Sequence, residues 1–590
     1  MEIKVREANK KEIQLRLGNE AIARGAWEAG VKVTASYPGT PSTEITENIA
    51  RYGEIKSQWA PNEKVAVEVA FGASVAGARA LSCMKHVGVN VAADPIFTVS
   101  YTGVNGGFVI VVADDPAMFS SQNEQDSRFY ARSAHVPMLE PSDSQECLDM
   151  MKLAYEISEK YDTPVFVRLT TRIAHARSLT ALGERNEMEL RPYVKDVRKY
   201  VMMPSNAIGR HVVVEKRMDD IARDCNGFDI NRAEMRGDVG VITSGASYQY
   251  VREAMPQASV LKLGMVYPLP KELIEEFAGN VKTLYVVEEL EPFIEDQIKA
   301  WQLEGIMISG KDKTGKQGEL SVAKIKRLFC GEEAEILPAG ENLPVRPPVL
   351  CPGCPHRAVF YAINKLKLRC VADIGCYTLG ALAPLSAVDT VICMGASIGM
   401  STGMDKAAGH EFSKKTVAVI GDSTFLHSGV TGLIDMVYNE STGTVLILDN
   451  STTGMTGHQE HAATGKTITG EPAPKVDLLQ LVKACGVKDV AVVDPFNLKE
   501  LEAALKSATA NEEPSVIIAL RPCVLLSKDR NAPVRVENCR NCGICMRIGC
   551  PAISRGESGV EIDDALCVGC GLCTRVCPFG CLKEAEQSYA

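Results

Sequence analysis

The chain has 590 residues, of which 46% are hydrophobic and 23% charged, and its formal net charge is -10. This composition predicts roughly four packed domains and excludes a disordered chain. The negative charge gives no support to nucleic-acid binding or to an anionic membrane surface, and no apolar run is long enough to span a bilayer.

The start of the chain, Met1 to Arg16, is charged and lacks the apolar core of a secretory signal. Many of the twenty cysteines cluster with the spacing of metal ligands, which fits a reducing compartment better than a secreted disulfide framework does. We therefore expect a cytoplasmic protein.

The first part of the chain alternates strand-like with helix-like runs, which predicts an α/β fold with a doubly wound parallel sheet in residues 1–190. A charged stretch, residues 191–236, is expected to link this domain to a second α/β unit, residues 237–345. A proline-rich linker around Leu343 to Pro348 then precedes a third α/β domain, residues 346–530. The strand-like runs of the first two units are Lys32–Ser36, Phe108–Ala113, Val165–Leu169, Val239–Thr243 and Leu284–Val287.

In the third α/β domain, Thr416 to Ile420 and Val445 to Leu448 are apolar runs separated by a helix-like stretch. The first run is followed by Gly421 and Asp422, and the second by Asp449 and Asn450. Because parallel strands end at the same edge of a sheet, the side chains of Asp422 and Asn450 are expected to converge on one hard cation, magnesium. A residue at a strand end is also commonly a turn or helix cap, which is the alternative interpretation.

Glycines in the same domain favour close approach of a diphosphate to the backbone. Gly421 precedes Asp422, and the loops at Gly375 and Gly395, with Ser423, are expected to offer backbone N–H groups to phosphate oxygens. The Gly-Asp to Asn spacing resembles the thiamine diphosphate motif, although Ser423 occupies a position that is usually glycine.

Two cysteine strings occupy the C-terminal segment, residues 531–590, and each ends in Cys-Pro. In bacterial ferredoxins three thiolates spaced C-x2-C-x2-C bind one cubane cluster, and the fourth, before proline, binds the neighbouring cluster. The predicted 4Fe–4S ligands are Cys539, Cys542, Cys545 and Cys577 for the first set, and Cys567, Cys570, Cys573 and Cys550 for the second. Zinc is the alternative, but its sites need only four ligands.

Two details of this segment depart from the pattern. The first string has four residues, Met546 to Gly549, before its last cysteine, where three are usual. Cys581 lies outside both strings and is expected to be a buried spectator.

Three further strings resemble those of the 2-oxoacid:ferredoxin oxidoreductases over essentially the whole chain. They are the turn-rich Tyr37 to Glu44, the small-residue helix from Glu63 to Gly72, and Ser120 to Asp126. The resemblance implies that thiamine diphosphate binds between a pyrimidine-binding domain, residues 1–190, and a diphosphate domain, residues 346–530. It also implies that residues 237–345 are a transketolase C-terminal-like domain without catalytic residues.

The resemblance assigns roles to single residues as well. Glu63 would protonate the aminopyrimidine ring, with Glu68 as the alternative. Thr40 would touch the substrate, and Arg128 and Arg132 would clamp the 2-oxoacid carboxylate. The carbonyl of Thr452 would be the third protein ligand of the magnesium ion.

A third cluster is implied by a Cys-Pro-Gly-Cys pair and two remote cysteines, which are Cys351, Cys354, Cys376 and Cys523. Such a cluster would carry electrons from the thiamine to the C-terminal segment. A redox dithiol, a zinc knuckle or simply buried thiols are the alternatives.

The expected reaction is therefore oxidative decarboxylation of a 2-oxoacid with coenzyme A, its electrons leaving through clusters to ferredoxin. The resemblance favours aryl 2-oxoacids, above all indolepyruvate, and implies a smaller second subunit in a heterodimer or heterotetramer. Pyruvate, branched-chain 2-oxoacids and phenylpyruvate are alternative substrates. A thiamine decarboxylase without redox chemistry and an electron-carrier protein are alternative functions.

Overall fold

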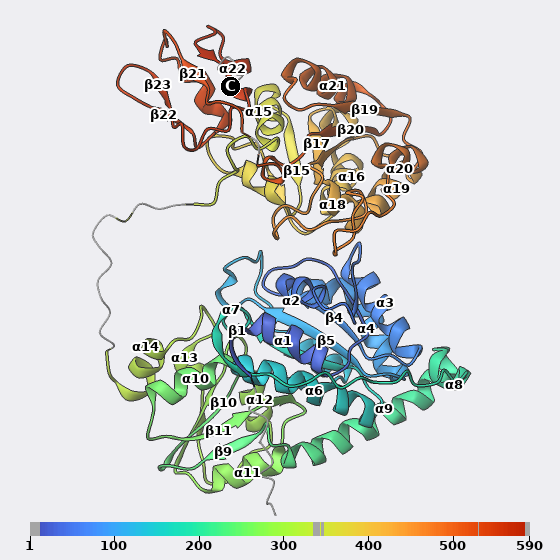
Figure 1. The fold of residues 1–590 in the computed structure, drawn as a ribbon, viewed down its shortest axis with the longest axis vertical. Helices are drawn as coiled ribbons and strands as arrows, with labels where there is room; N and C mark the ends of the chain where they lie inside the picture. Colours follow the sequence, from blue (N-terminus) through green and yellow to red (C-terminus); the bar gives the residue numbers. More distant parts are fainter. Residues whose placement is uncertain (1–11, 334–342, 344–346, 529, 585–590) are drawn as a thin grey trace, which may run out of the picture. The chain divides into compact units, whose positions relative to one another are not determined.

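The computed structural model of the chain describes residues 12–333, 343, 347–528 and 530–584. It divides into two compact units, residues 1–338 and residues 339–590 (Figure 1). The first eleven residues of the charged start, and residues 344–346 of the proline-rich linker, lie outside the described residues. None of the helices in the described part of the chain has the length and apolar content needed to cross a membrane.

The first domain of unit 1 is built on a seven-stranded sheet with the order β12-β6-β7-β5-β4-β2-β3, parallel except for β12. Every residue of the central strands β4, β5 and β7 is buried, as expected for a sheet covered on both faces. The doubly wound parallel sheet predicted from the sequence is confirmed. The strands are β2 (Val33–Ser36), β3 (Lys56–Trp59), β4 (Ala80–Lys85), β5 (Phe108–Asp114), β6 (Met138–Leu139), β7 (Val165–Thr170) and β12 (Met265–Tyr267).

Helices form a layer on each face of this sheet. One layer consists of α1 (Gly18–Glu28), α2 (Thr43–Ile49) and α6 (Ser144–Tyr161), and the other contains α3 (Glu63–Val75) and α4 (His86–Thr102). Alternate residues of β5 face the two layers, with Val109 and Val111 in one core and Ile110 and Val112 in the other. This alternation lets one strand contribute apolar side chains to both cores.

The second sheet of unit 1 has the order β14-β13-β10-β11-β9. Its strands are β9 (Arg232–Glu234), β10 (Val239–Ser244), β11 (Ser259–Leu263), β13 (Thr283–Val287) and β14 (Ile308–Ser309). Ile242 and Leu261 of this sheet belong to the same apolar core as Ile110 and Val112 of the first sheet, so the two domains of unit 1 pack directly on each other.

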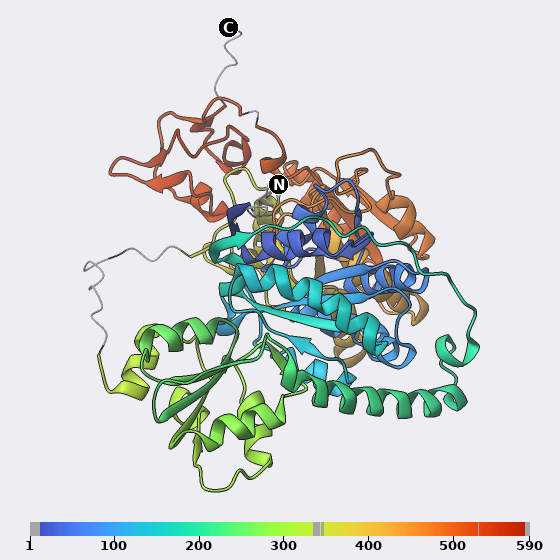
Figure 2. The same cartoon turned by 60° about the horizontal axis from the view of Figure 1, so that its bottom comes forward.

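Residues 191–236, expected as a linker, carry structure of their own. They contain α9 (Pro204–Asp224), a helix of 21 residues that packs on α4 along the edge of unit 1 (Figure 2). Val214 and Ile221 of α9 are fully buried. Most of the charged residues of α9 lie on its exposed face, but Arg217 is buried and donates to the carbonyl of Asp162 at 2.7 Å.

Unit 2 contains a six-stranded parallel sheet with the order β16-β15-β17-β18-β20-β19. Helices α15 (His356–Leu366) and α21 (Leu498–Ala510) cover one face, and α16 (Ala396–Ala408), α19 (Val430–Tyr438) and α20 (Leu478–Ala484) cover the other. The strands are β15 (Arg369–Ala372), β16 (Thr390–Val391), β17 (Thr416–Gly421), β18 (Thr444–Asp449), β19 (Asp489–Val493) and β20 (Ser515–Leu520). The predicted order of strand, loop, helix and strand around Asp422 is confirmed by β17, α19 and β18.

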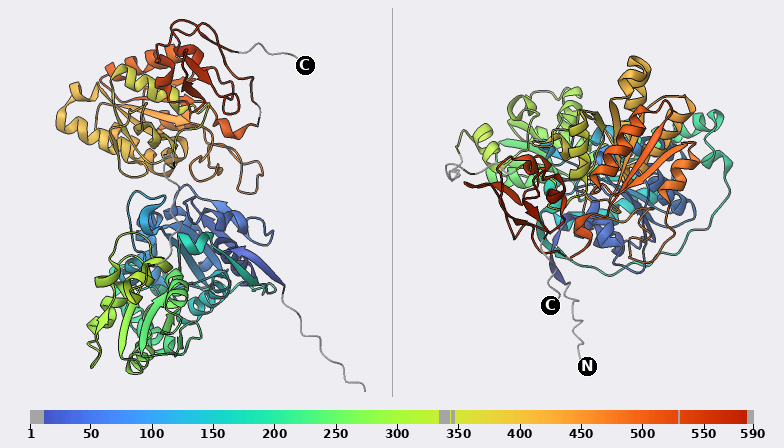
Figure 3. Two further views of the ribbon diagram at one scale, coloured as in Figure 1. Left: turned by 90° about the vertical axis from the view of Figure 1, so that its left-hand side faces the viewer. Right: turned by 90° about the horizontal axis from the view of Figure 1, so that it is seen from above.

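The C-terminal module of unit 2 is small and has little regular structure. It consists of the ribbons β21 (Arg535–Val536) with β24 (Leu582–Lys583) and β22 (Ile553–Arg555) with β23 (Val560–Ile562), and of α22 (Leu572–Val576). Its apolar residues pack against Ala358 of α15 and against Phe496, beside the parallel sheet of the same unit (Figure 3). A core of this size is typical of modules that rely on metal for stability.

Candidate functional site

Each predicted set of four cysteines in the C-terminal module lines one cavity. The first cavity is lined by Cys539, Cys542, Cys545 and Cys577, and the second by Cys550, Cys567, Cys570 and Cys573. The last cysteine of each string therefore crosses to the other string, which is the arrangement of ligands in two-cluster ferredoxins. Nowhere in the described residues do three or more His, Cys, Asp or Glu side chains form a group suited to a single metal ion.

The structure also accounts for the two departures from the ferredoxin pattern. The extra residue of the first string is accommodated by Gly549, whose φ of +65° is in the left-handed region. A Cβ at this glycine would lie 3.0 Å from Cδ of Pro384. Cys581 is buried and lines the first cavity, where its thiol donates to the carbonyl of Asn538 at 3.2 Å.

The four cysteines of the implied third cluster come from three segments of unit 2 and gather near Asn450. Burial, followed by the neighbouring thiols of Cys523 and Cys351, raises the pKa of Cys376 to about 11. Burial likewise raises the pKa of Cys354 to about 12, with Cys376 and Cys351 close to it. The N–H of Cys523 donates to the carbonyl of Asn450 at 2.8 Å.

Three oxygen-bearing groups converge where β17 and β18 end. Asp422 is buried, and the side-chain amide of Asn450 lies 3.1 Å from its Oδ1 and 2.9 Å from the carbonyl oxygen of Thr452. With its nitrogen toward these oxygens the amide donates to both, whereas with its oxygen toward them it completes a set of three oxygen ligands. Oδ2 of Asp422 is buried without a hydrogen-bond partner. These groups fit a magnesium ion.

Two neighbours of Asp422 were not found from the sequence. Burial, followed by the charge of Asp422, raises the pKa of Asp449 to about 6. Nε2 of His461, from the loop after β18, lies 3.3 Å from Oδ2 of Asp422. A divalent cation would offset the repulsion between the two carboxylates. No local pattern marks His461, because it reaches the site only through the path of its loop.

Two of the predicted glycines, Gly375 and Gly421, lie against the ring of Tyr377. A Cβ at Gly375 or at Gly421 would lie 2.3 Å or 2.8 Å from this ring, so both positions require glycine in this packing. Gly395 begins α16 with a φ of +81°, and its N–H donates to Oδ2 of Asp373 at 3.1 Å. The amino end of α16 thus already holds a carboxylate, and burial raises the pKa of Asp373 to about 7.

In unit 1 the turn that carries Thr40 lies at the carboxyl edge of the first sheet. It follows β2, and the neighbouring strand β4 ends at Lys85. A Cβ at Gly39 would lie 3.1 Å from Cβ of Lys85, whose Nζ donates to the carbonyl of Ser120 at 2.6 Å. Burial lowers the pKa of Lys85 to about 8. The sequence had not singled out this lysine, whose Cβ lies against the Thr40 turn at Gly39.

The two glutamates proposed for the aminopyrimidine lie in different environments. Glu63 is the first residue of α3 and is 5% exposed, and a Cβ on Gly88 of α4 would lie 2.7 Å from its Oε1. Glu68 is exposed and pairs with Lys64 on the surface of the same helix. Only Glu63 has the low-dielectric surroundings that strengthen a hydrogen bond to a cofactor ring.

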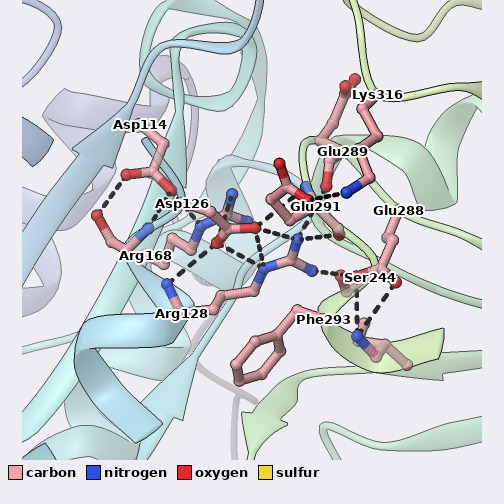
Figure 4. Close-up of polar contacts among 12 residues, drawn as sticks. Asp114, Asp126, Arg128, Arg168, Ser244, Glu288, Glu289, Glu291, Phe293 and Lys316 are labelled. Atoms are coloured by element: carbon pink, nitrogen blue, oxygen red, sulfur yellow. Dashed lines mark hydrogen bonds and ion pairs between the residues drawn. The ribbon is translucent and has the colours of Figure 1, made fainter. Parts of the chain in front are cut away.

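Arg128 is part of a buried network of ion pairs (Figure 4). Its guanidinium pairs with Asp126 and Glu288, donates to the carbonyls of Glu289 at 2.8 Å and Glu291 at 3.0 Å, and has no exposed surface. Because its guanidinium N–H groups already have partners, they are not available to a substrate carboxylate. Arg128 therefore does not fit its predicted role of clamping the carboxylate of the 2-oxoacid. Arg132, on the same helix α5 (Arg128–Ala134), is exposed.

The Arg128 network makes a strong prediction about stability. Arg128→Met should destabilise unit 1 by about 3–5 kcal/mol, because it leaves the buried carboxylates of Asp126 and Glu288 without their main counter-ion. Denaturant unfolding followed by tryptophan fluorescence measures this, because Trp27, Trp59 and Trp301, the only tryptophans of the chain, all belong to unit 1.

Arg172→Met is the matched control for this prediction. Arg172 forms a two-point ion pair with Glu319 in the same unit, but its side chain is 57% exposed. Loss of this ion pair should lower the free energy of unfolding by less than about 1 kcal/mol, because exposed ion pairs contribute little to stability. Equal destabilisation in the two variants would contradict the counter-ion argument.

Comparison with protein-family models gives three matches. Residues 24–233 match the thiamine diphosphate-binding domain of pyruvate flavodoxin/ferredoxin oxidoreductase. Residues 373–519 match the C-terminal thiamine pyrophosphate-binding domain of thiamine pyrophosphate enzymes, and residues 560–583 match a 4Fe-4S binding domain. The last match covers the second cysteine string.

Curated relatives extend over nearly the whole chain. The chain is 42% identical to indolepyruvate oxidoreductase subunit IorA of Archaeoglobus fulgidus, with 99% of each chain covered. It is 40% identical to the subunit of the same name from Pyrococcus horikoshii, with 97% of each covered. A more distant relative, 2-oxoglutarate synthase subunit KorA of Methanothermobacter thermautotrophicus, is 26% identical over 46% of this chain and 86% of its own length.

Proposed function

The chain belongs to the family of indolepyruvate oxidoreductase subunit IorA, within the 2-oxoacid:ferredoxin oxidoreductases, and from this premise we propose its reaction and its site residues. The proposed reaction is the oxidative decarboxylation of an aryl 2-oxoacid, with indolepyruvate favoured, in which coenzyme A accepts the acyl group and oxidised ferredoxin accepts the electrons. The products are an aryl-acetyl-CoA, carbon dioxide and reduced ferredoxin. The preference for indolepyruvate follows the names of the relatives.

One observation within unit 2 supports this proposal most strongly. The oxygen groups around Asp422 adjoin the Cys351, Cys354, Cys376 and Cys523 set, because Cys523 donates to the carbonyl of Asn450. That set adjoins the second set in turn, because a Cβ on Gly353 would lie 3.6 Å from Cβ of Cys570. Cation-binding oxygens, an internal cysteine set and the C-terminal sets thus form a continuous series, as electron transfer out of the protein requires.

Thiamine diphosphate, when bound, supplies the electron sink for decarboxylation of a 2-oxoacid. Asp422, Asn450 and the carbonyl of Thr452 would hold its magnesium ion, and Gly375, Gly395, Gly421 and Ser423 would allow the diphosphate to approach the backbone. Glu63 would hold a proton at the aminopyrimidine ring. Thr40 and Arg132 remain the proposed substrate contacts, and the buried side chain of Lys85 lies against Gly39 of the same turn.

Two 4Fe–4S clusters are proposed for the C-terminal cavities, and a third for the Cys351, Cys354, Cys376 and Cys523 set. The family relatives are named as subunits, so we propose a smaller partner subunit in a cytoplasmic, oxygen-sensitive heteromer. Another 2-oxoacid substrate is the main alternative, and a non-redox thiamine decarboxylase is a second one.

The proposal is tested with the chain purified without oxygen, alone and together with its partner subunit. We expect extractable thiamine, about eight irons per chain for two clusters or about twelve for three, and reduction of a viologen dye by indolepyruvate only when coenzyme A is present. Turnover without any dye reduction would favour the non-redox decarboxylase. Faster dye reduction with pyruvate, phenylpyruvate or a branched-chain 2-oxoacid would show that indolepyruvate is not the preferred substrate. The proposed class of reaction would then still hold.

A further inference from the structure

Arg357 is a buried cation between two of the cysteine sets. It belongs to α15, three residues after Cys354, and is 2% exposed. It lines the cavity of the second set, together with Cys550, Cys567, Cys570 and Cys573. No pattern in the sequence distinguishes it from the other arginines.

The hydrogen bonds of Arg357 join two turns that carry cluster ligands. Nε donates to the carbonyl of Cys351 at 2.9 Å, and Nη2 donates to the carbonyl of Leu350. Nη1 donates to the carbonyls of Ile548, at 3.2 Å, and Gly549. Ile548 and Gly549 belong to the stretch with the extra residue of the first string, directly before Cys550. One guanidinium thus binds both the Cys-Pro-Gly-Cys turn and the two residues directly before Cys550.

None of these partners carries a charge that balances the guanidinium. All four are backbone carbonyls, and among the described residues no carboxylate forms an ion pair with Arg357. Its ionisable neighbours are thiols, those of Cys550, Cys354, Cys351 and Cys570. A buried cation without a counter-ion is strongly unfavourable in a folded protein. Iron–sulfur clusters bound by these cysteines would be anionic and would supply the missing negative charge.

We propose that Arg357 is the shared counter-ion of the cluster of the second set and of the internal Cys-Pro-Gly-Cys cluster, and that it raises their reduction potentials. This inference rests on the proposed function, because it requires clusters at both places. A cluster held by four thiolates is anionic and gains one more negative charge on reduction, so a buried cation beside it favours the reduced form. Arg357 would thereby help these clusters to accept electrons.

The test is a redox titration of the iron–sulfur signals in the anaerobically purified full-length chain, with its partner subunit. Arg357→Gln should make reduction of at least one cluster about tenfold less favourable, a shift of about 59 mV to a more negative potential for a one-electron couple. Arg357→Lys keeps the charge and loses the forked donor geometry, so it should retain most of the wild-type potential. Arg575→Gln is the control, because Arg575 lies in α22 beside Cys573 but is exposed and therefore screened.

Each outcome decides the proposal. Unchanged potentials in Arg357→Gln at full iron content would overturn it. So would an equal shift in Arg357→Lys, or a loss of iron in both Arg357 variants, since Arg357 would then act only by holding the turns. If only Arg357→Gln loses its iron, a wild-type potential in Arg357→Lys supports the role of the charge. A wild-type chain without any iron–sulfur signal would instead refute the proposed function itself.

Discussion

Glu63→Gln should lower the turnover of 2-oxoacid by about 10²- to 10⁴-fold, the usual contribution of a general acid or base. Glutamine has nearly the same size as glutamate, so the packing of Glu63 against Gly88 should survive while the proton is lost. The measurement is the initial rate of viologen reduction by indolepyruvate with coenzyme A at saturating thiamine diphosphate. Iron content and the amount of bound thiamine should stay near wild type.

Glu68→Gln is the control within the same helix. Glu68 is an exposed partner of Lys64, so its loss should change the rate less than about twofold, as is usual for surface sites away from the chemistry. The reverse result, a large loss in Glu68→Gln and little in Glu63→Gln, would transfer the role to Glu68. A loss of bound thiamine in Glu63→Gln would mean that the residue acts in binding instead.

Asp422→Ala should weaken thiamine diphosphate binding by at least about 100-fold, or ~2.7 kcal/mol, because it removes the only proposed magnesium ligand that carries a charge. The magnesium-dependent affinity for thiamine diphosphate, measured by titration calorimetry, reports this directly. The substitution should not unfold the sheet, since the charge of Asp422 contributes to the raised pKa of Asp449 and its removal relieves that repulsion.

Asp435→Ala is the matched control for Asp422→Ala. Asp435 lies on α19, between the two strands that carry Asp422 and Asn450, and is exposed. Its replacement should leave cofactor affinity unchanged. Wild-type affinity for thiamine diphosphate in Asp422→Ala would contradict the assignment of Asp422 as a magnesium ligand. Equal losses of affinity in both variants would indicate a general disturbance of this part of unit 2.

Much of the fold followed from local patterns. The apolar runs that end at Asp422 and Asn450 became the neighbouring parallel strands β17 and β18, because a sheet covered on both faces demands such runs. The crossed grouping of the cysteines around two cavities also agrees with their spacing. In contrast, the charged segment 191–236 suggested a linker, and only packing on α4 shows that α9 is part of unit 1.

The family, the sheets and the groups of cysteines could be predicted from the chain alone, because they depend on residue type and spacing. The folded structure was needed to distinguish residues of the same chemical type. The tertiary fold sets the burial and the partners of each one. It buried Arg128 in an ionic network with Glu288, 160 positions away, and left Arg132 exposed. It also buried Glu63 rather than Glu68, and placed Arg357 among thiols from distant segments. Burial and counter-charge are supplied by distant parts of the chain, so no local pattern contains them.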